Sequence, residues 1–483
     1  MKAFEIPLPE VQKRLSFENP WWIAGHGIDP ERRNWPRRAY FHSFQKLVRE
    51  LGVHRAIVLI GPRRVGKTVM LAQTIQTLLD DGVPGTHILQ LSLDTPLYSG
   101  RSLESMVRIF TELHRHPADR QLWVFFDEIQ YVKDWEVHLK SLVDTFRHIR
   151  FVASGSAAAA LRMKSRESGA GRFSDFVLPP LTFAEYLDFA ELTDSLIVEE
   201  EKADSLVPAY YTPAIDRLNA AFVDYLNYGG FPEAVMNPVV RENPTRFLRQ
   251  DIVEKVLLKD LPSLYGIADT QELNRFFNVL AYNTGDEVSP EALSKHSGIG
   301  KQKLQDYLEY LEAAFLIRRV HRLDDNARRL QRTRTFKIYL TNPSIRAALF
   351  GYIDANDPAI GALAETAVWS QWLHSTSIIE SLHYARWKQG RTDLEVDLVS
   401  VDNRTQSPRF LVEIKWSDRA YKDWGELRGI RALAERYPLA RRALVTTLTA
   451  AGIGKDGKLE IEFMPTSLHC YTIARNLLRS TQI

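Results

Sequence analysis

Residues 57–70, IVLIGPRRVGKTVM, contain a short apolar run that ends at a glycine and is followed by a helical pattern. The run at 57–60 predicts a strand buried on both faces, because β-branched residues dominate it and no polar residue alternates with them. A buried strand, a glycine-containing loop and a helix in that order are typical of a phosphate-binding site. This stretch therefore predicts an α/β fold with a parallel sheet.

The loop between the strand and the helix matches the pattern G-x-x-x-x-G-K-[ST] at every fixed position. Gly61 and Gly66 allow positive φ angles, so that successive backbone N–H groups can surround an anion. Lys67 would then reach the β- and γ-phosphates of ATP, and the Thr68 hydroxyl would ligate Mg²⁺. The predicted nucleotide-binding residues are Gly61, Pro62, Arg63, Arg64, Val65, Gly66, Lys67 and Thr68.

An acidic pair ends another apolar run. Residues 122–126, LWVFF, predict a strand that is followed by Asp127 and Glu128. In a parallel sheet this pair would lie at the same edge as the phosphate loop. Asp127 would hold Mg²⁺ through water, and Glu128 would act as the general base toward the attacking water.

Two further strands are predicted at 87–93 and 150–153. The second is followed by Ser154, which is a candidate sensor of the γ-phosphate or of the attacking water. Ser156 supports a different interpretation, in which this polar segment only caps a helix at 157–162. Both interpretations stay open.

The composition limits the classes to which the chain can belong. A length of 483 residues suggests about three domains, and a hydrophobic content of 45% suffices for packed cores. A net charge of +2 is too balanced to indicate nucleic-acid binding, so any DNA surface would be a local patch. Cys470 is the single cysteine, which excludes an internal disulfide. Since no apolar signal region is present and no apolar run approaches about 18 residues, we expect a cytoplasmic protein without membrane partners.

Several motifs occur in an order that resembles one known family. They are GPRRVGKT (61–68), VFFDE (124–128), ASGS (153–156), GRF (171–173), PLTFAEY (180–186) and YGGFPE (228–233). In this order they resemble the bacterial and archaeal AAA+ ATPases that carry a C-terminal domain of uncharacterised function. The resemblance implies ATP hydrolysis and a lid-like helical region at about 222–267, and helices are expected around 251–258. Where this family usually has Asp-x-Gly after a later strand, the chain has Thr341, Asn342 and Pro343.

Arg172, in the GRF motif, allows two interpretations. A guanidinium group can neutralise charge on a transferring phosphoryl group of a neighbouring subunit in a homo-oligomer. It can also pair with a structural carboxylate. Both remain open.

Residues 269–345 have the pattern of a winged helix. Ser289 can cap a helix that begins at Pro290, and apolar residues spaced along 304–311 give the next helix one apolar face. Strands expected at 315–320 and 335–340 would flank a wing that contains Arg328, Arg329, Arg332 and Arg334. These arginines suggest contact with a DNA backbone. Winged helices also serve as interaction modules, and this alternative stays open.

Residues 353–483 predict a small α/β domain whose chemical signal is carboxylates. Adjacent strands at 394–401 and 409–416 would bring Asp397 close to Glu413 and Lys415. Two acids can hold a divalent cation, and a neighbouring lysine can position or deprotonate a water that attacks a phosphodiester.

This order of an aspartate followed by Glu-x-Lys resembles the restriction-endonuclease-like PD-(D/E)XK nucleases. Glu365, on a helix expected at 362–373, could add a metal ligand. Glu395 shares the strand face of Asp397 and is the alternative ligand. The rival hypothesis is a domain that keeps the fold and its charges for binding only.

The predicted order of domains is an N-terminal irregular segment packed on the ATPase (1–40), a P-loop AAA+ ATPase core (41–190), a helical lid and connector (191–268), a winged helix (269–345) and a nuclease-like domain (353–483). The predicted function is ATP hydrolysis that couples nucleotide state to DNA binding and metal-dependent DNA cleavage. The alternative is an ATP-switched DNA- or protein-binding regulator whose nuclease-like domain is inactive.

Overall fold

The computed structural model describes residues 7–156, 171–201, 208–323, 335–402, 404–405, 407–437 and 439–482. The chain forms two compact units, one spanning Met1–Pro179 and the other Pro180–Thr481. Two features expected from the sequence lie outside the described residues: the helix at 157–162 and the wing arginines Arg328, Arg329, Arg332 and Arg334.

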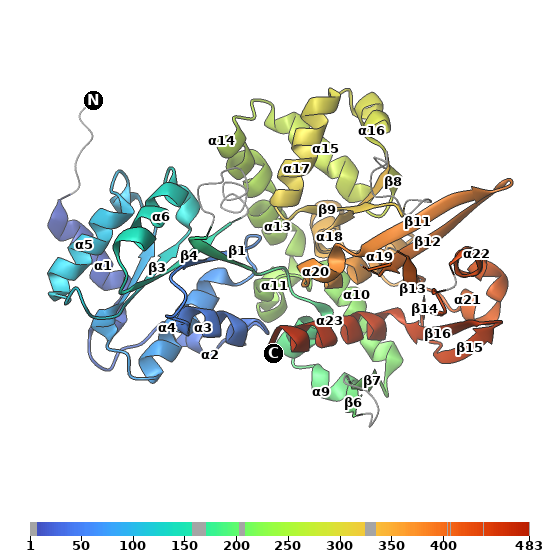
Figure 1. Ribbon diagram of the computed structural model, residues 1–483, viewed down its shortest axis with the longest axis horizontal. Helices are drawn as coiled ribbons and strands as arrows, with labels where there is room; N and C mark the ends of the chain where they lie inside the picture. Colours follow the sequence, from blue (N-terminus) through green and yellow to red (C-terminus); the bar gives the residue numbers. More distant parts are fainter. Residues whose placement is uncertain are drawn as a thin grey trace. The chain divides into compact units, whose positions relative to one another are not determined.

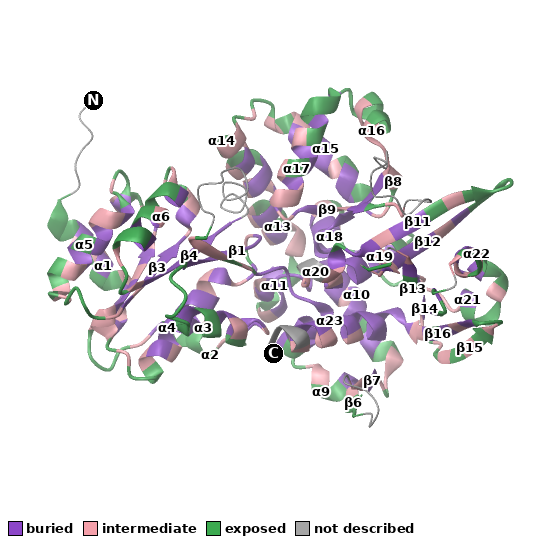
Figure 2. Cartoon of the chain, in the orientation of Figure 1, coloured by how far each residue is buried: buried purple, intermediate pink, exposed green. Residues whose placement is uncertain are grey.

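A five-stranded parallel sheet forms the centre of the first unit (Figure 1). Its strand order is β2-β3-β4-β1-β5, with β1 Ala56–Ile60, β2 Ile88–Ser92, β3 Leu122–Asp127, β4 Ile149–Gly155 and β5 Phe173–Val177. The apolar run explains β1, which is buried along its whole length (Figure 2). Because β4 lies between β1 and β3, the segments that follow these three strands meet at one edge of the sheet.

Helices cover both faces of this sheet. The helical segments are α1 Leu8–Glu18, η1 Pro20–Trp22, α2 Pro30–Asn34, α3 Phe41–Arg49, α4 Lys67–Asp80, η2 Gly85–His87, η3 Pro96–Tyr98, α5 Leu103–His114, η4 Ile129–Tyr131 and α6 Trp135–Thr145. In Figure 1, α5 and α6 lie on one face and α3 and α4 on the other. This alternation is typical of a doubly wound α/β sheet.

The N-terminal segment differs from the irregular segment that we expected, because α1 and α2 occupy much of it. Two of its tryptophans hold it to the sheet. The indole N–H groups of Trp21 and Trp22 both donate to the carbonyl oxygen of Ile88, at 3.2 and 2.9 Å.

The second unit begins with helices and one short β-ribbon. These elements are α8 Phe183–Phe189, α9 Thr193–Leu196, β6 Val198–Glu200, β7 Ala209–Tyr211, α10 Ile215–Tyr228, α11 Pro232–Met236, α12 Pro238–Glu242, α13 Pro244–Leu248, η6 Arg249–Glu254, η7 Val256–Asp260 and α14 Leu261–Tyr265. The helices expected around 251–258 correspond to η6 and η7, which are π-helical.

Three helices and a small antiparallel sheet, β8-β10-β9, come next. They are α15 Thr270–Tyr282, β8 Glu287–Val288, α16 Pro290–Ser297, α17 Lys301–Ala313, β9 Ile317–His321 and β10 Phe336–Leu340, followed by α18 Ser344–Phe350. Ser289 caps α16 as expected, because its hydroxyl oxygen accepts the N–H of Ala292 at 3.1 Å. The apolar face of α17 is buried, with Leu304 and Leu311 among its members.

A six-stranded mixed sheet ends the chain, in the order β11-β12-β13-β14-β16-β15. Its elements are α19 Ile360–Trp372, α20 Thr376–Ile379, β11 Leu382–Gln389, β12 Thr392–Val401, β13 Pro408–Glu413, α21 Arg419–Lys422, η8 Trp424–Leu427, α22 Arg428–Arg436, β14 Arg442–Thr447, β15 Gly452–Asp456, β16 Leu459–Pro465 and α23 Thr466–Gln482. Strand β12 is antiparallel to β11 and β13, whereas β13, β14 and β16 are parallel. Ile430 and Leu433 of α22 join the buried core under this sheet.

Asn342, at the local departure from the resembling family, has a structural role. Its side-chain amide donates to the Tyr225 hydroxyl at 3.2 Å, and its side-chain oxygen accepts the N–H of Ser344 at 2.9 Å. A Cβ added at Gly230 would lie 2.4 Å from this carboxamide. Gly230, the second glycine of the YGGFPE motif, thus leaves room for Asn342.

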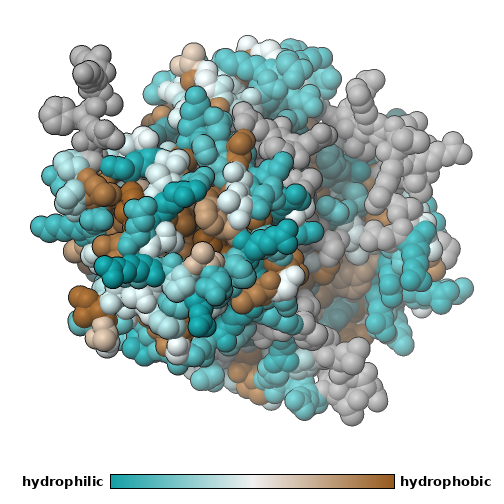
Figure 3. Space-filling view, turned by 60° about the vertical axis from the view of Figure 1, so that its left-hand side comes forward, coloured by the Kyte–Doolittle hydropathy of each residue, from teal (hydrophilic) through white to brown (hydrophobic). Residues whose placement is uncertain are grey.

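Hydrophilic residues predominate over the face in Figure 3, with hydrophobic residues dispersed among them. Within the described residues, no helix has both the length and the apolar character needed to cross a lipid bilayer.

Candidate nucleotide site and carboxylate cluster

The phosphate loop connects β1 to α4 in the way that its glycines predict. Gly66 has φ +95°, and α4 begins at the next residue, so the positive end of this helix faces the loop. Gly61 is required for another reason, because an added Cβ would lie 2.2 Å from the carbonyl oxygen of Leu178. Arg64 also has a positive φ, +65°, which is uncommon for a residue with a side chain.

Lys67 folds back over the loop. Its buried ammonium group donates to the carbonyl oxygens of Gly61 and Pro62, at 3.0 and 2.7 Å. These bonds keep a positive charge beside the backbone that would surround the phosphates. The ammonium group thus lies against the backbone of the loop.

Asp127 connects the loop to the two neighbouring strands. Thr68 Oγ1 donates to Asp127 Oδ2 at 2.8 Å, and Ser154 Oγ donates to Asp127 Oδ1. Ser154 Oγ also accepts the backbone N–H of Glu128 at 3.2 Å. Burial, and then the charge of Glu128, raise the pKa of Asp127, whereas the bonds from Ser154 and Thr68 lower it. The site thus places an acid, two hydroxyls and a lysine at one edge of the sheet.

Glu128 has a left-handed backbone conformation, with φ +57° and ψ +48°. For a non-glycine residue this conformation costs free energy and is often found at functional sites. The side-chain amide of Gln130 donates to Glu128 Oε2. The side-chain oxygen of the same Gln130 accepts the N–H of Ser156 at 3.1 Å. Gln130 was not predicted from the sequence, since it belongs to none of the motifs. Its position two residues after Glu128 was the signal that could have indicated it.

These residues fit ATP with Mg²⁺. Thr68 and Asp127 supply the hard oxygen ligands that Mg²⁺ prefers, directly or through water. Gly61 lets the loop pack against the carbonyl oxygen of Leu178, from which an added Cβ would lie only 2.2 Å away. The lysine and the helix terminus supply the positive charge for phosphates.

Arg172 lies away from this site within its own chain. Its backbone oxygen accepts the N–H of Ala56 at 2.9 Å, at the amino end of β1, whereas the phosphate loop follows the carboxyl end. The guanidinium Nε contacts Asp144 Oδ1 at 2.6 Å, and both side chains are more than 40% exposed. This contact matches the interpretation in which Arg172 pairs with a structural carboxylate.

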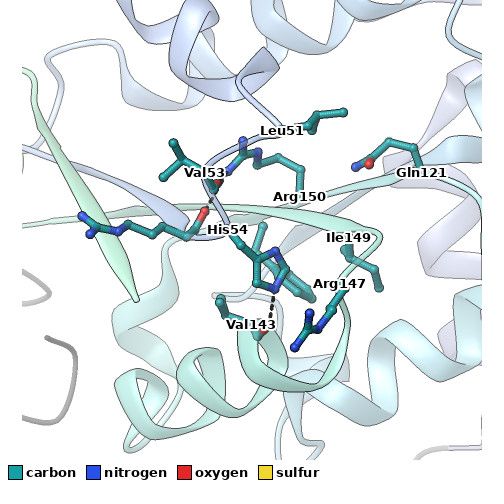
Figure 4. A pocket seen from close by; sticks show the side chains of 10 residues that line it. Leu51, Val53, His54, Gln121, Val143, Arg147, Ile149 and Arg150 are labelled. Atoms are coloured by element: carbon teal, nitrogen blue, oxygen red, sulfur yellow. Dashed lines mark hydrogen bonds between the residues drawn. The ribbon is translucent and has the colours of Figure 1, made fainter. Parts of the chain in front are cut away.

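A small pocket lies at this same amino end of the sheet (Figure 4). Arg150 lies in its wall and donates to the carbonyl oxygens of Val53 and Arg55, at 3.0 and 2.8 Å. His54 contacts the carbonyl oxygen of Val143 at 2.6 Å. Because the phosphate loop follows the opposite ends of the strands, this pocket is not the nucleotide site.

The second unit brings together the predicted carboxylates and Lys415. Asp397 lies on β12 and Glu413 on β13, with Lys415 shortly after β13. Lys415 Nζ lies 2.8 Å from Glu413 Oε1 and 4.0 Å from Asp397 Oδ2. Asp397 Oδ2 also accepts the N–H of Ile414 at 2.8 Å.

Lys337, which the sequence analysis did not select, completes this cluster from β10. Its ammonium nitrogen lies 2.9 Å from Glu365 Oε1, 2.6 Å from Glu395 Oε1 and 3.9 Å from Asp397 Oδ1. Its side chain is only 5% exposed. All five residues of β10 are buried. The lysine within this strand is the signal that could have revealed the interaction, since a buried lysine needs an acidic partner.

The acids of the cluster are strongly perturbed. Burial, and then the charge of Asp397, raise the pKa of Glu365 to about 7 and that of Glu413 to about 8. Burial disfavours the charged form of Lys337, but its acidic neighbours more than offset this effect and raise its pKa. The lysines therefore stay charged, while burial disfavours the charged forms of Glu365 and Glu413.

A divalent cation does not fit the cluster while Lys337 is in place. No group of three or more His, Cys, Asp or Glu residues in the described part of the chain is arranged to hold a metal ion. The carboxylates surround an ammonium group instead. The predicted metal ligands Glu365, Asp397 and Glu413 thus lie close together, but as the partners of lysines.

The five-stranded parallel sheet and its phosphate loop form a P-loop fold of the AAA type, and comparison with known families agrees. Residues 53–187 match the family model described as an AAA domain. Residues 219–356 match a model described as a domain of unknown function, DUF8612. The chain therefore carries an AAA domain followed by an uncharacterised domain.

Three relatives with similar sequences are themselves uncharacterised. A protein of Haemophilus influenzae is 26% identical over 306 residues, which cover 62% of this chain and 70% of the relative. Two proteins of Methanocaldococcus jannaschii are each 24% identical, over 270 and 326 residues. These matches cover 54% and 65% of this chain and 55% and 66% of the relatives' own length.

Solved structures give weaker similarities. PCH-2 of C. elegans matches with a TM-score of 0.28 and 18% identity, covering 43% of this chain and 61% of that one. The replication initiator DnaA, bound to AMPPCP and single-stranded DNA, matches with a TM-score of 0.29 and 10% identity, covering 59% and 92%. Similarities at this level carry no argument about function.

Proposed function

We propose that the protein hydrolyses ATP at the edge of the first unit's sheet and that nucleotide state controls DNA binding by its second unit. The observation that supports hydrolysis is the connection from Thr68 through Asp127 to Ser154. It joins the phosphate loop to the acidic pair through hydroxyl groups. Through this connection the neighbouring strands would sense whether the loop is occupied.

Each residue has a distinct task in this proposal. Lys67 neutralises the terminal phosphates, while Thr68 and Asp127 hold Mg²⁺, which supplies charge stabilisation when bound. Glu128 accepts a proton from the attacking water. Gln130 holds the carboxylate of Glu128, and Ser154 reports on the γ-phosphate through Asp127.

The test is ATP turnover by the full chain compared with that of Lys67→Ala. The variant should lose nucleotide binding and turnover, because the only motif lysine of the loop is removed. Arg101→Ala is a suitable control, since residue 101 lies outside the loop. Equal turnover by Lys67→Ala and the wild type would refute the proposal.

DNA binding is proposed from the elements α15 to β10. Their order, with three helices followed by a β-hairpin, is that of a winged helix. The first turn of α17 exposes Lys301, Gln302 and Lys303 to solvent. Lys301 pairs with Glu291 at 3.6 Å, and the acids of α17 outnumber its lysines, so the wing arginines would carry the phosphate contacts.

The corresponding test replaces the four wing arginines, Arg328, Arg329, Arg332 and Arg334, with alanine. Affinity for DNA should fall, and its dependence on salt should flatten by about one unit of slope for each arginine that no longer reaches a phosphate. Arg419→Ala and Arg442→Ala, two exposed changes outside this region, should keep the wild-type slope. If the salt dependence of DNA affinity is unchanged in the wing variant, the winged helix would instead be a protein-interaction module.

Metal-dependent DNA cleavage is the second candidate function. It is supported by the proximity of Asp397, Glu413 and Lys415, and it is opposed by the ammonium group of Lys337 among the same carboxylates. We therefore favour an ATP-switched DNA-binding protein whose nuclease-like site is closed. DNA nicking by wild type, Asp397→Asn and Lys415→Ala in Mg²⁺ or Mn²⁺ separates the two functions. Cleavage by the wild type that both variants abolish would establish the nuclease.

A further inference from the structure

The pocket at the amino end of the first unit's sheet is lined by positive and neutral side chains (Figure 4). Arg55, Arg147 and Arg150 lie in its wall together with His54, and none of its ten lining residues, all within the described part of the chain, is acidic. Its empty volume, part of which is open solvent, is about 280 Å³. Because pockets for drug-sized ligands usually measure about 300–1,000 Å³, this one suits a small group.

Arg150 is the buried cation of this pocket. It is 5% exposed, whereas Arg55 and Arg147 are exposed. Its Nη1 donates to the carbonyl oxygens of Val53 and Arg55, at 3.0 and 2.8 Å. Its Nε and Nη2 are also buried, and neither has a hydrogen-bond partner among the described residues. A buried donor without a partner is costly, so two such donors on one side chain indicate a missing acceptor.

The two nitrogens without partners lie on the same edge of the guanidinium group of Arg150. This edge can donate two parallel N–H bonds to two oxygens of one carboxylate or phosphate group. The bonds of Nη1 to the backbone hold the edge in one direction. Burial lowers the pKa of Arg150 more than the charge of Glu50 raises it. Glu50 Oε1 accepts the N–H of Gly52 at 3.0 Å instead of an N–H of this edge.

We propose that this pocket is an anion site, separate from the nucleotide site, in which the Nε–Nη2 edge of Arg150 binds two oxygens of a phosphate group. The arginines of the wall favour phosphate over a carboxylate, because a phosphate group carries more negative charge. Val53 and Arg55, whose carbonyl oxygens Arg150 holds, directly precede β1. A bound phosphate would therefore stabilise the amino end of the strand that leads to the phosphate loop. The proposal requires neither ATP hydrolysis nor DNA binding.

The test measures binding of inorganic phosphate to the full chain by isothermal titration calorimetry, without nucleotide and at constant ionic strength. The phosphate loop can also hold phosphate, so both proteins in the comparison carry Lys67→Ala, and any phosphate left at the loop is common to both. Adding Arg150→Gln removes the guanidinium group and should weaken phosphate binding about tenfold or more. The proposal is overturned if the parent Lys67→Ala protein binds no phosphate, or if Arg150→Gln leaves its phosphate affinity unchanged.

Two further changes in the same background test the geometry. Arg150→Lys keeps a positive charge but lacks the planar fork, so it should also weaken phosphate binding. Equal phosphate affinity in Arg150→Lys and its parent would contradict binding by the fork. Arg108→Gln, an exposed change on α5 outside the pocket, should leave phosphate affinity unchanged. Acetate should bind the parent more weakly than phosphate does, and equal affinity for the two anions would refute the assignment to phosphate.

The replacements of Arg150 change a buried side chain, so they can unfold the chain. In that case Arg55→Gln combined with Arg147→Gln carries the test, because both side chains are exposed and the variant should fold. In the Lys67→Ala background this pair of changes should weaken phosphate binding, and phosphate should raise the midpoint of thermal unfolding less than in the parent. Unchanged phosphate affinity in this variant overturns the proposal.

Discussion

Thr68 Oγ1 donates a hydrogen bond to Asp127 Oδ2 at 2.8 Å, although 59 residues separate them in the sequence. The bond joins the first turn of α4 to the carboxyl end of β3. Because Asp127 is buried and also accepts a bond from Ser154, it holds three elements in one position. The hydroxyl groups of Thr68 and Ser154 thus meet at one carboxylate.

This bond leads to a prediction for Thr68→Val. Valine has nearly the same shape but cannot donate to Asp127 or ligate Mg²⁺, so Mg²⁺-dependent ATP turnover should fall by about 10- to 100-fold. Thr74→Val is the control on the same helix, because Thr74 is buried on α4 and its hydroxyl donates to the carbonyl oxygen of Met70, away from the site. Steady-state turnover at several Mg²⁺ concentrations checks the result. Equal losses in the two variants would assign the effect to packing of the helix.

Glu128→Gln should separate nucleotide binding from hydrolysis. The amide keeps the size of the side chain but cannot accept a proton from water, so turnover should fall by about 10²- to 10⁴-fold while ATP affinity stays near the wild-type value. Affinity is measured with a fluorescent ATP analogue and turnover by phosphate release. Glu112→Gln, at an exposed position of α5, should change neither. Loss of binding that parallels loss of turnover would contradict a role as general base.

Arg172 and Asp144 should behave as a pair. Both side chains are more than 40% exposed, so the ion pair should stabilise the fold by less than about 1 kcal/mol. Arg172→Gln and Asp144→Asn should therefore cause similar small losses of stability and leave ATP turnover unchanged. Turnover is best measured across a range of protein concentrations. If ATP turnover falls only in Arg172→Gln, and falls further at protein concentrations at which subunits associate, the guanidinium acts on a neighbouring subunit instead.

The strands that carry the nucleotide site could be predicted because each is a continuous apolar run. β1 and β3 are buried almost throughout; the phosphate loop follows β1, and the acidic pair stands at the end of β3. β5 was not predicted, because Phe173–Val177 alternates partly exposed polar and apolar residues at the edge of the sheet. Its position explains why Arg172, placed among catalytic candidates by its motif, lies at the other end of the strands.

The carboxylate cluster could be predicted only in part. Asp397 and Glu413 lie on adjacent strands and Lys415 follows two residues after Glu413, so strand pairing and short spacing were enough to bring them together. Lys337 comes from another sheet and meets Glu365 28 residues away, an interaction that depends on tertiary packing. No local pattern encodes that interaction. The most consequential residue of the cluster therefore became visible only in the structure.

His469, on α23, should make the stability of the second unit depend on pH. Burial lowers the pKa of this histidine to about 4, whereas an unfolded histidine titrates near about 6.5. Between these values the unfolded chain binds a proton that the native chain does not, so stability is present above about pH 6.5 and is lost as pH falls. From pH 7 to pH 5 this group alone should remove about 2 kcal/mol from the free energy of unfolding.

The variant His469→Gln stays neutral at every pH and should remove this contribution. Denaturant unfolding at pH 7 and pH 5, followed through the transition of the second unit, measures the difference between wild type and variant. His296→Gln, at an exposed position of α16, is the control and should keep the wild-type loss of stability. Other groups titrate in the same range in all three proteins, so only the difference in stability loss between the proteins reports on His469. If His469→Gln loses as much stability as the wild type between pH 7 and pH 5, the buried histidine is not the source of acid sensitivity.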